Sequence, residues 1–70
     1  MQAYRTESPY YFASKNLLPA GSLVFFSEKL HRYVHPTEGV LLDGHPRLHL
    51  LSEAESQALA AQWRDALTRY

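Results

Sequence analysis

The sequence predicts an α+β domain in which a small antiparallel sheet of four to five strands packs against one C-terminal amphipathic helix. Three observations predict it. Short segments rich in aromatic and β-branched residues recur between residues 10 and 50, turn signals separate these segments, and a stretch without Gly or Pro begins at Ser52. The chain has 70 residues, which is enough for a single domain spanning residues 1–70.

The first strand is expected at Tyr10–Ser14, where three aromatic residues are consecutive. Residues 2–8 are mixed and polar and predict no strand. The segment Lys15–Ser22 contains Pro19, which lacks an amide proton, and Gly21, which tolerates a positive φ. We therefore expect this segment to be a loop.

The clearest hairpin joins strands at Leu23–Ser27 and His31–His35. If residues 28–31 form a four-residue loop, Phe25 lies opposite Val34 and Phe26 opposite Tyr33. Directly opposed residues share a face of the sheet. One face then receives Leu23, Phe25 and Val34, and the other receives Val24, Phe26, Tyr33 and His35.

A second hairpin is expected between Gly39–Leu42 and Pro46–Leu50, with Asp43-Gly44 at the turn. A two-residue turn would mix aliphatic and basic residues on both faces. A three-residue connection over residues 43–45 instead keeps the aliphatic residues on one face, namely Val40, Leu42, Leu48 and Leu50. Pro46 favours an edge position for the second strand.

The last segment is predicted to be a helix. Ser52 followed by Glu55 forms a capping box, in which the Ser52 hydroxyl accepts the Glu55 amide and the Glu55 side chain reaches back to the Ser52 amide. Apolar residues recur at helical spacing at Leu59, Trp63, Ala66, Leu67 and Tyr70. We expect this stripe to cover the aliphatic face of the sheet, formed by Leu23, Phe25, Val34, Val40, Leu42, Leu48 and Leu50.

The other face of the predicted sheet carries an unusual mixture of aromatic, aliphatic and basic residues, where polar residues would be expected in contact with water. Its members are the candidate binding residues Phe26, Tyr33, His35, Leu41, Arg47 and His49. Three interpretations remain open. The sheet curls so that Tyr10, Tyr11 and Phe12 cover this face, the face binds a protein partner or a second copy, or its rings stack on single-stranded nucleic acid.

The order of short strands, the entry at Leu18–Ser22 and the closing helix resemble small SH3-like barrel proteins over residues 10–51. The resemblance implies a sheet that curls into a partial barrel. Folds of this kind carry many unrelated functions, so it implies no function for this chain.

Composition narrows the function classes. Seven basic residues balance seven acidic ones, which argues against a dedicated nucleic-acid binder. The absence of cysteine excludes disulfides as a stabilising device for so small a domain, and favours a dimer or another protein partner as the stabilising contact. We find no secretory signal and no membrane-spanning run, so a cytoplasmic location without membrane contact is expected.

The histidines predict no metal site. His31 and His35, and again His45 and His49, are four residues apart, a spacing that spans roughly 13 Å in a strand and is too long for one ion. No nucleophile, phosphate-binding or metalloprotease motif is present. We therefore expect no enzyme activity, no cofactor and no small-molecule substrate.

These observations favour a small protein-binding or regulatory module. The bias of five Arg to two Lys and the Ala and Leu content are typical of a GC-rich bacterial or phage genome, which suggests a phage or mobile-element accessory protein that occupies a host protein's surface. The alternative hypothesis is a small nucleic-acid-binding β-barrel module that uses the aromatic and basic face.

Overall fold

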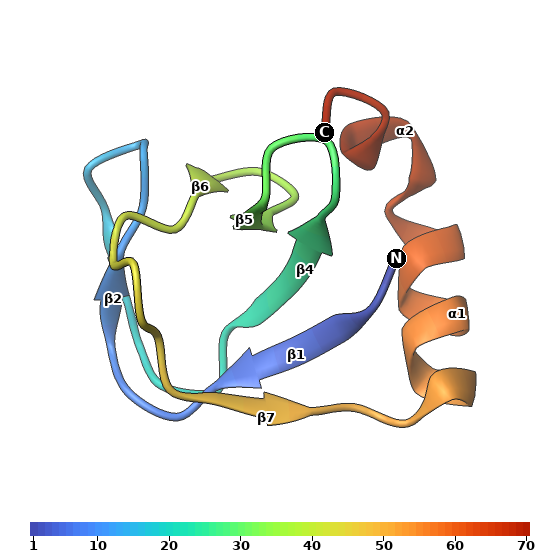
Figure 1. The fold of residues 1–70 in the computed structure, drawn as a ribbon, viewed down its shortest axis with the longest axis horizontal. Helices are drawn as coiled ribbons and strands as arrows, with labels where there is room; N and C mark the ends of the chain where they lie inside the picture. Colours follow the sequence, from blue (N-terminus) through green and yellow to red (C-terminus); the bar gives the residue numbers. More distant parts are fainter.

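The computed structural model describes residues 1–70 and contains seven strands and two helices (Figure 1). The strands are β1 (Ala3–Thr6), β2 (Tyr10–Tyr11), β3 (Leu17–Leu18), β4 (Leu23–Ser27), β5 (Arg32–His35), β6 (Gly39–Val40) and β7 (Leu48–Leu50). The helices are α1 (Glu53–Gln62) and α2 (Arg64–Leu67).

Five strands form one antiparallel sheet in the order β6-β5-β4-β1-β7, and β2 and β3 form a separate two-stranded hairpin. The helices lie on one side of the sheet and β2 lies on the other (Figure 1). The α+β class with an antiparallel sheet and a C-terminal helix is confirmed. The sheet is not closed into a barrel, because its two edge strands, β6 and β7, lie at opposite ends of the order.

The predicted hairpin of β4 and β5 is confirmed in its register. Phe25 pairs with Val34, Phe26 with Tyr33, and Ser27 with Arg32. The loop that joins these strands contains a positive φ of 53° at His31. The hydrophobic pattern of the two strands therefore carried enough information to place each side chain on its correct face.

The predicted hairpin in the forties is wrong. Residues 39–40 pair with β5, whereas residues 48–50 pair with β1 at the other end of the sheet. The Asp43 side chain accepts the His45 amide (2.8 Å), so the turn chemistry is present locally, but the chain does not double back. It runs along β2, where the Leu42 amide donates to the Tyr11 carbonyl.

One interior strand of the sheet, β1, was not predicted. β1 lies between β4 and β7, pairing Ala3 with Phe25 on one side and Tyr4 with Leu50 on the other. Thr6 shows how its polar residues are accommodated, because its hydroxyl accepts the Ser22 amide (3.1 Å). Leu17–Leu18, expected to be part of a loop, forms strand β3 opposite β2.

The helix begins as predicted at Ser52, whose hydroxyl accepts the Glu55 amide (3.2 Å) and contacts the Glu55 carboxylate (3.2 Å). The Glu55 carboxylate thus accepts a hydrogen bond from the Ser52 hydroxyl, whereas the sequence predicted that it would accept one from the Ser52 amide. The single helix predicted to the C-terminus is interrupted at Trp63 (φ −105°, ψ 17°), where α1 ends and α2 follows. Neither helix has the length and apolar character needed to cross a membrane.

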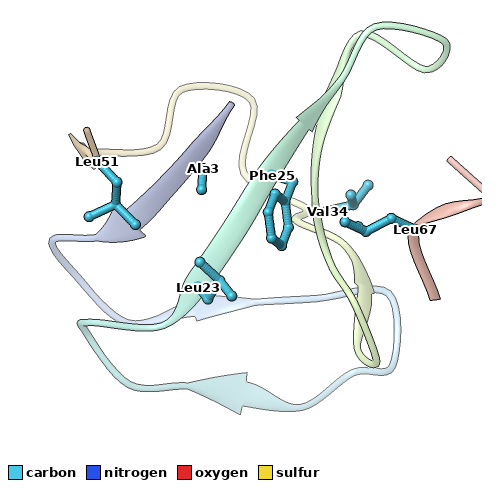
Figure 2. Close-up of a cluster of buried hydrophobic side chains, with 6 residues drawn as sticks. All are labelled: Ala3, Leu23, Phe25, Val34, Leu51 and Leu67. Carbon is cyan, nitrogen blue, oxygen red and sulfur yellow. The ribbon is translucent and has the colours of Figure 1, made fainter. Parts of the chain in front are cut away.

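The helices cover a cluster of six buried residues, which we call the helix-side cluster (Figure 2): Ala3, Leu23, Phe25, Val34, Leu51 and Leu67. Leu59, Trp63, Tyr70 and Val40 pack against it, as predicted for the helical stripe and for Val40. The buried Ser56 fastens α1 to β1, because its hydroxyl accepts the Ala3 amide (3.1 Å) and the Gln2 side-chain amide (2.8 Å).

The opposite face carries a smaller cluster of Phe12, Val24 and Leu41, which we call the hairpin-side cluster. Tyr10 and Leu18 of the hairpin pack against it, together with Leu48. Three aliphatic residues predicted beneath the helix are therefore elsewhere. Leu48 lies on the hairpin side and Leu50 is exposed, because the strand that was expected to pair with β6 pairs with β1 in the opposite phase. Leu42 is also exposed, at a position after β6 where the chain runs along β2.

Candidate functional site

Three aromatic side chains from three adjacent strands form a continuous row on the hairpin-covered face. Tyr4 comes from β1, Phe26 from β4 and Tyr33 from β5. The Tyr4 and Tyr33 ring centroids are 5.4 Å apart with the ring planes at 89°, and the Phe26 and Tyr33 centroids are 5.2 Å apart at 64°. Both pairs have the edge-to-face geometry that aromatic rings prefer. We call these three residues the aromatic row.

The register of the sheet explains why the rings meet. Phe26 and Tyr33 are directly opposed in β4 and β5, so their side chains share a face. Tyr4 is opposed to Val24 in β4, and Val24 belongs to the hairpin-side cluster. The ring of Tyr4 thus lies on that same face and contacts Tyr33, which is two strands away.

The row is half-buried and continues toward a sheet edge. Tyr4, Phe26 and Tyr33 each have intermediate exposure. Leu50 is opposed to Tyr4 in β7 and is 60% exposed. A groove of about 350 Å³ adjoins the row, lined by Tyr4 and Phe26 together with Met1, Gln2, Glu28, Lys29 and Tyr70. The row therefore offers apolar and aromatic surface beside a shallow cavity.

The aromatic row carries no charge near neutral pH. Burial raises the pKa of the Tyr4 phenol above its ordinary value of 10.0, and the neighbouring Tyr33 raises it further. Glu28 and Lys29 line the adjoining groove with one charge of each sign. The surface thus suits apolar contacts and neutral hydrogen bonds better than a strongly charged ligand.

Of the six predicted binding residues, Phe26 and Tyr33 lie in the aromatic row. Leu41 does not belong to the exposed surface, because it is 1% exposed in the hairpin-side cluster and bridges to Phe12. The cause is the hairpin itself, whose Phe12 covers this part of the face. Tyr10 and Phe12 cover part of the face, as the interpretation with a covering N-terminal strand expected, but the sheet does not close into a barrel and Tyr11 is exposed.

His35 lies on the same face of the sheet but has a structural position. Its ring meets Phe12 edge to face (5.8 Å, 74°), and its Nδ1 accepts the amides of Thr37 (3.1 Å) and Glu38 (3.2 Å). Burial lowers the pKa of His35 below its ordinary 6.5, although the nearby Glu38 carboxylate acts in the opposite direction. Hydrogen bonds from Asn16 and Ser14 in turn lower the pKa of Glu38. His35 thus stabilises the turn that leads into β6.

The two basic residues of the predicted site are not beside the rings. Arg5 lies two residues after Ala3 in β1, so its side chain is on the same face as Ala3, which belongs to the helix-side cluster. His49 is opposed to Arg5 and therefore also lies on the helix-covered side. Arg47 precedes β7, and its amide donates to the Tyr10 hydroxyl. The structure therefore separates the aromatic residues from the basic residues that were expected to accompany them.

Tyr4 and Leu50 complete this surface and were not among the predicted residues. Tyr4 was missed because residues 2–8 predicted no strand, and Leu50 because its strand was assigned the opposite phase. The alternation of Ala3 and Tyr4, one small residue followed by one aromatic, is the signal that could have indicated a strand with two different faces.

No group of three or more His, Cys, Asp or Glu side chains lies close enough together to hold a metal ion. What the site presents chemically is ring edges and faces, two phenol hydroxyls and an aliphatic side chain. No family model matches this chain, and neither a curated protein nor a solved structure is similar to it at a significant level.

Proposed function

We propose that this chain is a small non-catalytic module that binds a protein through the aromatic row. The observation that carries the proposal is the continuity of half-buried rings across three strands, ending at the exposed Leu50. Aromatic side chains are enriched in protein interfaces, because they bury a large apolar area while a phenol hydroxyl can still bond to a neighbour. The partner is expected to present aliphatic or aromatic side chains and no strong net charge.

The experiment uses the immobilised chain to capture partners from a lysate of its own source. Tyr33→Ala and Phe26→Ala remove a ring from the row, so the captured partner should be lost or strongly reduced. The matched control is Tyr11→Ala, which removes a ring that is 56% exposed on the hairpin, outside the row. Circular dichroism checks that every variant remains folded.

Three results would contradict the proposal. Capture by the row variants equal to that of the unchanged chain would exclude the row as the contact. Unfolding of both row variants would show that the rings are core residues. The nucleic-acid alternative would be supported instead if the unchanged chain binds a single-stranded oligonucleotide with an affinity that falls steeply with salt, and if the row variants lose this binding.

A further inference from the structure

The two edges of the five-stranded sheet differ in whether their outward backbone groups are bonded. At β6, residues 13 and 14 close the edge, because the Ala13 amide donates to the Val40 carbonyl (2.8 Å) and the Ser14 amide to the Glu38 carbonyl (3.1 Å). At β7, no strand lies beyond (Figure 1). The sheet thus has one closed edge and one open edge.

The hydrogen bonds between β1 and β7 show which groups of β7 face outward. The Glu7 amide donates to the Arg47 carbonyl (2.8 Å), and the Leu51 amide to the Ala3 carbonyl (3.1 Å). In an antiparallel pair the hydrogen-bonded residues alternate with residues whose amides and carbonyls point the other way. The backbone groups of Leu48 and Leu50 therefore face away from the sheet and are available to another strand.

The side chains of these two leucines share one face. Leu48 is opposed to Thr6 and Leu50 to Tyr4, so both lie on the side of the aromatic row. Leu48 packs against the hairpin-side cluster, whereas Leu50 is largely exposed. His49, between them, lies on the opposite face. The open edge consequently combines unpaired backbone groups with an exposed aliphatic side chain.

We infer that β7 pairs antiparallel with β7 of a second copy of this chain, about a two-fold axis at His49. Leu48 would then exchange two hydrogen bonds with the partner's Leu50, and Leu50 would exchange two with the partner's Leu48. The pairing would join two five-stranded sheets into one and cover Leu50. It goes beyond the proposed function, because it uses the sheet edge and does not require the rings to contact a partner.

The sequence of the strand favours a second copy as the occupant. Leu48-His49-Leu50 reads the same in both directions, so the two-fold pairing places leucine opposite leucine twice. A two-fold axis at Leu48 would instead place Leu50 opposite the partner's Pro46, which has no amide proton to donate. The zero formal net charge of the chain also adds no long-range repulsion between copies.

A single introduced cysteine tests this geometry, since the chain contains none of its own. In the inferred dimer the two His49 residues form a non-hydrogen-bonded pair with Cα atoms about 4.5 Å apart, which is within the range that a disulfide requires. Under mild oxidation, His49→Cys should form a covalent dimer in high yield. The control Leu42→Cys, at an exposed position outside β7, should give only the slow coupling of random collisions.

Equilibrium sedimentation of variants tests the same inference without a cross-link. Leu50→Lys adds a charge at an open edge, a device that prevents strand pairing, and should weaken dimerisation at least about tenfold. The matched control Leu42→Lys makes the same change at a leucine of similar exposure and should leave dimerisation unchanged. Circular dichroism establishes that both variants are folded.

The inference is overturned if the unchanged chain stays monomeric at millimolar concentration and His49→Cys couples no faster than Leu42→Cys. It is also overturned if Leu50→Lys and Leu42→Lys sediment alike, because the leucine at the open edge would then make no dimer contact. Both results leave the proposed function standing, since that proposal fails only through Tyr33→Ala and Phe26→Ala.

Discussion

The two faces of the five-stranded sheet are covered by unequal means. On one face, two helices close over six buried residues. On the other face, a hairpin of two-residue strands closes over three buried residues. The short hairpin covers only part of its face, which leaves the aromatic row half-buried. A binding surface can thus arise where a small domain has too few residues to cover both sides of its sheet.

The difference also affects how firmly each side is held. On the helix side, the C-terminal helices are held to β1 and β4 by buried apolar contacts and by the hydrogen bonds of Ser56. The hairpin side depends on Phe12 and on a few backbone bonds from residues 12–14. We therefore expect the hairpin to open at a lower free energy than the sheet and helix.

The largest effect is expected from removing a buried ring on the helix side. Phe25→Ala should lower the free energy of unfolding by about 3–5 kcal/mol, which is most of the stability of a small domain. Phe12→Ala, equally buried on the hairpin side, should cost less, about 3 kcal/mol at most, because the hairpin can close over the vacated space. Urea unfolding measures both values.

If the alanine variants do not fold, Phe25→Leu and Phe12→Leu give the same comparison with smaller losses. An equal or greater cost at Phe12 would show that the two sides are equally firm, contrary to our account.

The next effect tests the phase of the chain after β6. Leu41→Ala should cost about 2–4 kcal/mol, because Leu41 is buried in the hairpin-side cluster. Leu42→Ala, the same change one residue later, should alter stability by no more than about 0.5 kcal/mol, because Leu42 is 53% exposed. Thermal unfolding of the two variants checks the prediction. A larger loss of stability in Leu42→Ala than in Leu41→Ala would instead support the sequence prediction, in which Leu42 is the buried residue.

The smallest effect concerns pH and acts on the hairpin side. The pKa of His35 is lower in the folded chain than its ordinary 6.5, so the unfolded chain binds this proton more readily. The stability contributed by neutral His35 is complete above pH 6.5, and it is lost as the pH falls through the folded-state pKa. The melting temperature should therefore decrease between pH 7 and mildly acidic pH.

His35→Asn should reduce this dependence, because the Asn oxygen can accept the same two amides without titrating. His45→Asn, at an exposed histidine, is the control and should leave the pH dependence as it was. An unchanged pH profile in His35→Asn would assign the effect to other groups.

Local sequence pattern was sufficient where both partners of a contact lie close in the chain. The β4–β5 register followed from matching the aromatic and aliphatic phases of two neighbouring segments. The helix start followed from Ser52 and Glu55, which are three residues apart. Both features depend on residues within about a dozen positions of each other, where turn length and periodicity restrict the alternatives.

Contacts between distant segments were not predictable from the same pattern. β1 is a strand because Ala3 and Tyr4 fit between β4 and β7, and its hydrogen-bonding partners lie many residues away. Asp43-Gly44 indicated a hairpin, but β6 and β7 are taken by separate partners at opposite edges. Tertiary pairing thus overrode local turn chemistry, and with it the expected grouping of Leu41, Arg47 and His49 with the rings.

Native-state hydrogen exchange is the most direct test of the unequal coverage on which the aromatic row depends. The amides of Phe26 and Leu51, bonded to Gln2 and Ala3, should exchange only when the whole chain unfolds. The amides of Ala13 and Ser14, bonded to Val40 and Glu38, should exchange through a smaller opening of the hairpin. Exchange of all four amides at one common free energy would contradict the account, because the hairpin and the helix side would then form a single cooperative unit.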